Sequence, residues 1–193
     1  MKVGMHRLLI LAFAGLLPAH AAADEKQIAL ERISAVVTAD WNDDGGFDRA
    51  LLVESSEDTV DLLIYLSTGG NFTPMKLHTR ASGIAWRGLM WGQQPELALS
   101  DKGSMLLHAM NEAIGRHRWT ETRTIAFKDG AFIVAGYTYS YRDTIGEYRD
   151  IHCDVNLLTG SGVRNGKAFR AVQRATPVAK WTDALIPPAC RPE

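Results

Sequence analysis

The chain has 193 residues, of which 46% are hydrophobic and 22% charged, and its formal net charge at pH 7 is −1. This composition is typical of a globular protein and excludes wholesale disorder, a collagen-like repeat and a coiled coil. A net charge so close to zero gives no broad basic field, so we expect no nucleic-acid partner.

Residues 1–23 have the pattern of a secretory signal peptide. Lys2 and Arg7 give a positive start, residues 8–19 are largely apolar, and small residues offer cleavage after Ala21 or Ala23. The apolar run is shorter than the about 20 residues that a membrane-spanning helix needs. We therefore expect a signal peptide at 1–23, a periplasmic or secreted protein, and no membrane span after cleavage.

Strand patterns dominate the remaining chain. Asp129-Gly130 is a strong turn signal and predicts a hairpin that joins its two flanking strands. Residues 105–114 fit either part of a second hairpin or a partial helix. On the strand after the turn, Ile133 and Ala135 are expected to share a face with Tyr137, Tyr139 and Tyr141. The predicted strands are 33–38, 49–54, 60–66, 96–99, 104–109, 118–127, 132–141 and 148–158.

The spacing of the turn signals predicts the fold class. Turns recur about every ten residues, which is the pattern of all-β proteins. We found no linker, low-complexity segment or clear repeat, so residues 24–193 are expected to form a single β domain. Its sheets would be mostly antiparallel meanders, arranged like a propeller blade or a sandwich. A short C-terminal helical segment is expected at 178–185, before Pro187 and Pro188.

Cys153 and Cys190 are the two cysteines of the chain. In an exported protein, such a pair predicts a disulfide. The bridge would tie the C-terminal tail to the strand that carries Cys153. Two free, buried thiols are the alternative.

The segment 40–48 reads Asp-Trp-Asn-Asp-Asp-Gly-Gly-Phe-Asp and has oxygen-bearing side chains at alternate positions. Calcium binds about six to eight oxygen ligands, and Gly45 allows the sharp turn that such a loop needs. Leu51 stands where an EF-hand requires glutamate, so the expected unit is a strand, a calcium loop and a strand. A polar turn that binds no metal is the alternative. The candidate ligands of a structural calcium ion are Asp40, Asn42, Asp44, Asp48 and the carbonyl of Gly46.

From Asp40 to Val53, the pattern D-x-N-x-D-G-x-x-D-x-A-x-x-V resembles the calcium loop and strand of FG-GAP or VCBS repeats. Those repeats are β-propeller blade modules, and the resemblance covers residues 33–66. It implies a calcium-binding β module. Segments 129–136 and 156–160 also resemble strand ends of small secreted bacterial proteins, a likeness that implies no known activity.

Aromatic and basic residues are the candidate partner-binding side chains. Trp86 and Trp91 lie in a stretch with weak regular patterns, and exposed tryptophans often anchor partners. Arg116, Arg118 and Arg123 form a small basic cluster. We therefore expect a non-enzymatic module that binds a protein or a cell-envelope polymer.

Two other functions stay open. His152 and Asp154 share a strand face, so a small periplasmic hydrolase with its site near these residues is one alternative. The other is an inhibitor of a secreted enzyme, which would present a rigid protruding loop at 143–147.

Overall fold

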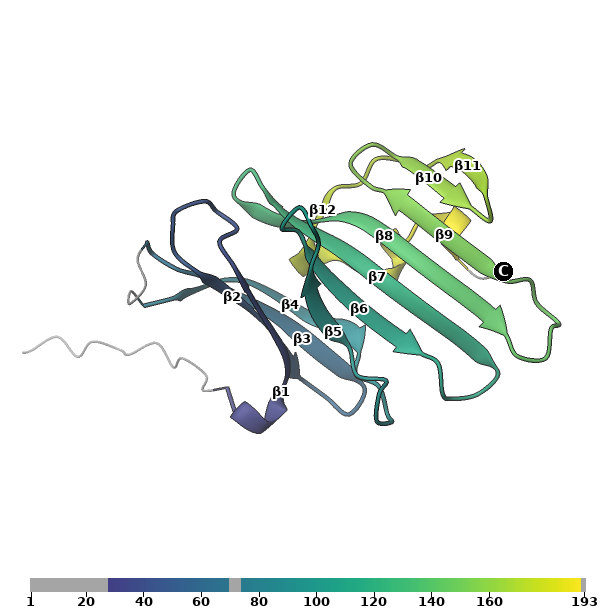
Figure 1. Ribbon diagram of the computed structural model, residues 1–193, viewed down its shortest axis with the longest axis horizontal. Helices are drawn as coiled ribbons and strands as arrows, with labels where there is room; N and C mark the ends of the chain where they lie inside the picture. Colours follow the sequence, from purple (N-terminus) through teal and green to yellow (C-terminus); the bar gives the residue numbers. More distant parts are fainter. Residues whose placement is uncertain (1–27, 70–73, 192–193) are drawn as a thin grey trace, which may run out of the picture.

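The computed structural model describes residues 28–69 and 74–191, in which two antiparallel sheets face each other (Figure 1). The expected signal peptide lies outside these residues. In the described part of the chain, no helix has the length and apolar character needed to cross a membrane. The all-β prediction is confirmed, and the arrangement is a sandwich of two open sheets rather than a propeller blade.

The first sheet has the order β1-β2-β3-β4, and the second has the order β11-β10-β9-β8-β7-β6-β5, with β12 paired to β8. Strands of the first sheet are β1 (Ile33–Ala39), β2 (Asp48–Glu54), β3 (Thr59–Leu66) and β4 (Lys76–Trp86). Those of the second are β5 (Glu96–Leu99), β6 (Met105–Asn111), β7 (His117–Lys128), β8 (Ala131–Asp143), β9 (Ile151–Asn156), β10 (Ser161–Arg164), β11 (Lys167–Arg170) and β12 (Thr176–Pro177).

Helical structure among the described residues is limited to short 3-10 turns. The segment 105–114 is a strand over most of its length, which rules out the partial helix. The C-terminal helical segment expected at 178–185 is likewise reduced to two single turns, because the backbone is extended at Trp181 and Thr182 between them. These turns are η1 (Leu30–Arg32), η2 (Val178–Lys180), η3 (Asp183–Leu185) and η4 (Pro188–Cys190).

The face predicted for the first part of β8 is wrong because the β7–β8 ladder contains an irregularity. Thr124 pairs with Gly136 but the next residue, Ile125, pairs with Val134, so β8 has one extra residue here. Such a bulge reverses which side chains face the core. Phe132 and Val134 therefore join the three buried tyrosines in the core cluster, and Ile133 and Ala135 lie outside it.

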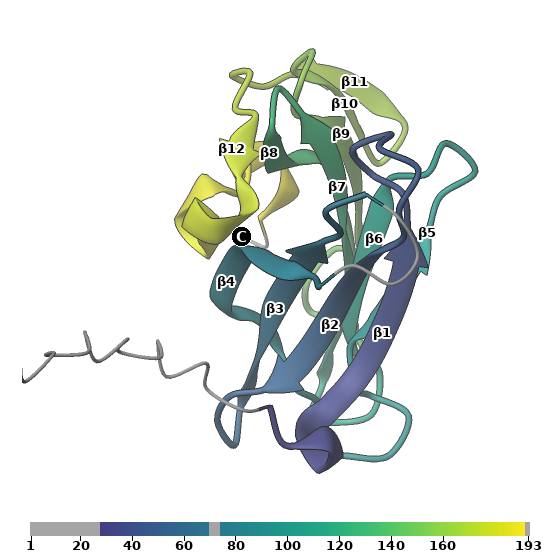
Figure 2. The same cartoon turned by 90° about the vertical axis from the view of Figure 1, so that its left-hand side faces the viewer.

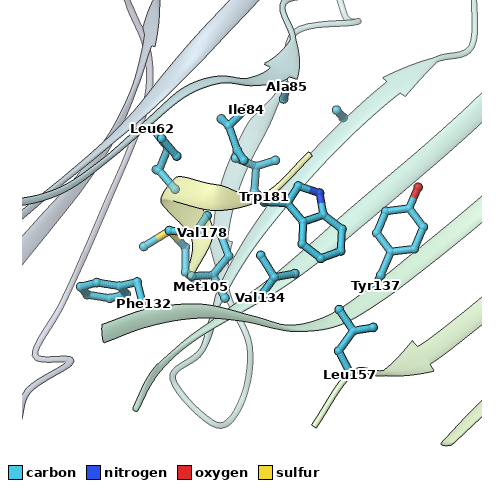
Figure 3. Packing of buried hydrophobic residues seen from close by; sticks show 14 of the residues in the cluster. Leu62, Ile84, Ala85, Met105, Phe132, Val134, Tyr137, Leu157, Val178 and Trp181 are labelled. Atoms are coloured by element: carbon cyan, nitrogen blue, oxygen red, sulfur yellow. The ribbon is translucent and has the colours of Figure 1, made fainter. Parts of the chain in front are cut away.

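The core lies between the two sheets and includes the C-terminal segment. Leu62 of β3 and Met105 of β6 come from opposite sheets, and Val178 and Trp181 enter the same cluster (Figure 3). The Trp181 ring lies 6.2 Å from the ring of Tyr137. A segment without long strands or helices is thus held by the burial of its apolar side chains.

A disulfide joins Cys190 of η4 to Cys153 of β9, as predicted. Both cysteines are buried. Figure 2 shows residues 176–191, which we call the C-terminal segment, beside β4 and β8 at one edge of the sandwich. The disulfide therefore fixes the end of a segment that closes this edge.

Candidate functional site

A cleft of about 590 Å³ lies between the end of β4, the inner face of β7 and β8, and the C-terminal segment. We call it the interlayer cleft. Its size falls within the range of small-ligand pockets, which is roughly 300–1,000 Å³. The side chains that give it chemical character are Trp86, Trp119, Glu121, Arg123, Tyr139 and Asp183.

The alternation of β7 explains why charged and aromatic residues line this cleft. Trp119, Glu121 and Arg123 occupy every second position, so they share the inner face of the sheet. Glu121 is paired with Tyr139 of β8 and Arg123 with Tyr137. Residues paired across two neighbouring strands share a face of the sheet, so these tyrosines lie beside Glu121 and Arg123.

Arg123 is buried, with only 2% of its surface exposed. Its Nη2 atom donates to Oε1 of Glu121 at 2.8 Å and lies 3.8 Å from Oδ1 of Asp183. Its Nε and Nη1 atoms are also buried and have no hydrogen-bond partner within residues 28–69 and 74–191. A buried donor without a partner costs about 1–3 kcal/mol, so these two nitrogens, which carry three N–H groups, favour a ligand that supplies acceptors.

The pKa of Glu121 is raised because burial disfavours its charged form. The charge of Arg123 and a hydrogen bond from the Tyr137 hydroxyl, 3.1 Å from Oε2, act in the opposite direction. Burial also raises the pKa of Tyr139 to about 12, which keeps its hydroxyl protonated at neutral pH. The cleft therefore presents donors and acceptors together.

Two tryptophans form the aromatic wall of the cleft. The rings of Trp86 and Trp119 lie 5.9 Å apart at an angle of 58°. Trp86 ends β4, where it pairs with Thr59 of β3, whereas Trp119 comes from the other sheet. The wall thus depends on the packing of the two sheets.

The structure brings together two of the five predicted partner-binding residues, Trp86 and Arg123. Trp91 lies in the turn after β4 and is 97% exposed. Arg116 forms ion pairs with Asp143 and Glu147. Arg118 is half-buried. It is an odd number of positions from Arg123 along β7, so the two side chains lie on opposite faces of the sheet.

Sequence reasoning missed four residues of the cleft: Trp119, Glu121, Tyr139 and Asp183. The spacing of Trp119, Glu121 and Arg123 along one predicted strand could have indicated a shared face. Asp183 comes from a segment more than 40 residues away in the chain, and no local pattern links it to β7.

The predicted calcium loop is held by hydrogen bonds between its own atoms. Oδ1 and Oδ2 of Asp40 accept from the N–H groups of Asp44 and Gly45, and Oδ1 of Asn42 accepts from Asp44 N–H as well. Oδ1 of Asp44 accepts from Gly46 N–H at 2.8 Å. The hydrogen bond from Gly46 N–H lowers the pKa of Asp44 most, and those from the Asn42 amide and the Ser67 hydroxyl lower it further. Gly45, at φ +82°, makes the sharp turn that the sequence predicted.

The carboxylate of Asp48 is directed to the backbone. It is fully buried, and its two oxygens accept from the N–H groups of Trp41 and Ser67 at 3.0 and 2.9 Å. Within the described residues, no three His, Cys, Asp or Glu side chains converge as a group that could hold a metal ion. Calcium binding at 40–48 therefore stays a prediction.

A melting experiment tests the calcium prediction. An ion at about 100 times its dissociation constant stabilises a folded protein by about 2.7 kcal/mol. If the loop binds calcium, the melting temperature should therefore be several degrees higher in calcium than in chelator. The variant Asp44→Ala should abolish this rise. Equal melting temperatures of the parent protein in both buffers would contradict it and leave the loop as a polar turn.

His152 and Asp154 both lie on the exposed face of β9. Nδ1 of His152 is 3.2 Å from Oγ of Ser140, and the Thr138 hydroxyl donates to Oδ1 of Asp154 at 3.0 Å. Each residue thus has its own partner on β8, and the two form separate pairs. This arrangement gives no support to a Ser-His-Asp relay.

The loop at 143–147 is tied down by Asp143. Its carboxylate accepts from Arg116 and from the N–H groups of Ile145 and Glu147. Hydrogen bonds from Arg116 hold the pKa of Asp143 well below its usual range. Hydrogen bonds therefore fix the base of this loop, as the inhibitor alternative expects.

In comparisons with known proteins, no protein-family model, curated protein or solved structure matches the chain. The resemblance of residues 33–66 to FG-GAP or VCBS repeats thus stays a prediction.

Proposed function

We propose that the protein is an exported, non-enzymatic binding module that holds a neutral sugar unit of a cell-envelope polymer in the interlayer cleft. The observation that carries this proposal is that two nitrogens of buried Arg123, Nε and Nη1, have no partner among the described residues, in a cleft walled by Trp86 and Trp119. Planar aromatic faces and a few fixed polar groups are typical of sites that bind small ligands.

The polar groups of the cleft match the chemistry of a sugar. Each sugar hydroxyl both donates and accepts hydrogen bonds. Arg123 supplies donors, and Glu121 and Asp183 supply acceptors close to it. The tryptophan rings offer apolar faces on which the C–H side of a sugar ring can lie.

The charges of the cleft favour a neutral sugar over an acidic one. Arg123 and Arg191 line the cleft together with three carboxylates, those of Asp58, Glu121 and Asp183. An acidic polymer would meet a surplus of negative charge, which opposes its binding. A neutral sugar avoids this repulsion.

Binding without catalysis is supported by the position of Glu121. Its two oxygens are engaged by Arg123 and by the Tyr137 hydroxyl, so it acts as a fixed acceptor rather than as a proton carrier. The disulfide supports an exported location, because such bonds persist in oxidising compartments.

Titration calorimetry with neutral trisaccharides tests the proposal. Cellotriose, maltotriose and N,N′,N″-triacetylchitotriose are suitable probes, and we expect saturable binding of at least one. Trp86→Ala should weaken this binding about tenfold, since it removes one stacking face. Trp91→Ala is the matched control: Trp91 is exposed and outside the cleft, so affinity should be unchanged.

Two results would contradict the proposal. One is the absence of binding to any neutral probe, and the other is equal affinity of the parent and Trp86→Ala proteins. The same samples are analysed for sugar products after incubation. Intact trisaccharide is expected, and hydrolysis would make the cleft an active site instead.

A further inference from the structure

A second groove, of about 450 Å³, lies between β11, the chain that follows it, and residues 184–191. We call it the C-terminal groove. Its lining is mainly apolar and includes Leu157, Phe169, Val172 and Leu185. Val172 is 71% exposed, so its side chain is accessible at the rim of this apolar depression.

Three arginines line the same groove, Arg170, Arg174 and Arg191. Arg191 donates to the carbonyls of Ala184 and Ile186, and Arg170 donates to the Ser161 hydroxyl at 2.7 Å. These partners are neutral, and the ion pairs found among the described residues involve other arginines. Among the described residues that line the groove, none is acidic.

We propose that the C-terminal groove binds a fatty acid, with its acyl chain along the apolar lining and its carboxylate beside the arginines. The apolar surface matches the acyl chain, and an excess of positive charge complements the carboxylate. Guanidinium groups are well suited to carboxylates because they offer paired donors in one plane. The groove adjoins the interlayer cleft and shares Ile186 and Arg191 with it. Arg174 lines the groove alone, so a variant at that position tests the fatty-acid site independently of the sugar site.

The lining favours an acyl chain over a peptide. A peptide brings backbone N–H groups that need acceptors. Among the described residues of the lining, the polar side chains are all guanidiniums, which only donate. The carbonyls of Ala184 and Ile186 already accept from Arg191. An acyl chain brings no donor into the groove.

The test measures binding of dodecanoate to the oxidised protein below the micellar concentration of the ligand. We expect saturable binding and about tenfold weaker binding to Arg174→Glu, which reverses one charge in the groove. Arg149→Glu is the matched control: it changes the net charge equally, and Arg149 lies in a different depression. Val172→Asp is a second groove variant at an exposed position and should also weaken binding.

A second ligand with a different head group tests whether the groove recognises the carboxylate. Dodecyltrimethylammonium has the same chain length and the opposite charge, and we expect it to bind at least about tenfold more weakly than dodecanoate. The proposal is overturned if dodecanoate does not saturate, if Arg174→Glu and Arg149→Glu bind it equally, or if both head groups bind alike. Melting curves of all variants establish that each remains folded.

Discussion

Replacing both Cys153 and Cys190 by alanine is expected to lower the free energy of unfolding by about 4 kcal/mol. The bridge closes a loop over a separation of 37 residues, and the chain-entropy model gives roughly this stabilisation for such a loop. In a protein of this size, that loss corresponds to a melting temperature about 10 °C lower. Chemical denaturation of the oxidised parent and of the double variant measures the difference.

The same variant should loosen the C-terminal segment before the rest of the sandwich unfolds. The segment would keep the burial of Val178 and Trp181 and the pairing of β12 with β8, but it would lose its covalent link to β9. We expect trypsin to cleave at Lys180 or Arg174 faster than in the parent. Reduced parent protein serves as the control and should match the variant. Melting temperatures of oxidised parent and variant within 2 °C, a margin of about 1 kcal/mol, would contradict this account.

Replacing Asp48 by alanine is expected to cost about 4 kcal/mol of folding free energy. The change leaves the buried N–H groups of Trp41 and Ser67 without acceptors, at about 1–3 kcal/mol each. These two bonds join the start of the 40–48 loop to the end of β3, so their loss should affect both β2 and β3. Urea denaturation of parent and variant measures the effect.

Asp44→Ala is the matched control for Asp48→Ala. Both remove a carboxylate from the same loop, but Asp44 lies at the exposed part of the turn. We expect a much smaller loss for Asp44→Ala in the absence of calcium. Equal losses for the two variants would show that the buried carboxylate does not have the role assigned to it.

The sequence predicted most of the fold because its signals are local. Asp129-Gly130 adopts positive φ at both residues and joins β7 to β8, as the turn signal indicated. β4 was not predicted. It is an edge strand with two irregularities in its pairing to β3 and with Gly83 near its end. Those features break the alternation on which strand prediction depends.

The candidate site was less predictable because its parts come from distant segments. Trp86 and Arg123 were singled out for different reasons, and the packing of β4 against β7 makes them neighbours in one cleft. Arg123 was expected in a small basic cluster with Arg116 and Arg118. Its position on the inner face of β7 instead buries it beside Glu121. The alternation of side chains along β7 can be seen in the sequence. Which of the two faces lies against the other sheet depends on how the sheets pack.

Binding of a neutral sugar in the interlayer cleft can be followed at the tryptophan side chains, because two of them form the wall of the cleft. The chain has five tryptophans, whose indole N–H signals can be resolved by NMR after ¹⁵N labelling and assigned with single Trp→Phe variants. On titration with the trisaccharide that binds, the signals of Trp86 and Trp119 should shift saturably while that of Trp91 stays fixed. A shift confined to Trp91, or none at Trp86 and Trp119, would contradict sugar binding in the cleft.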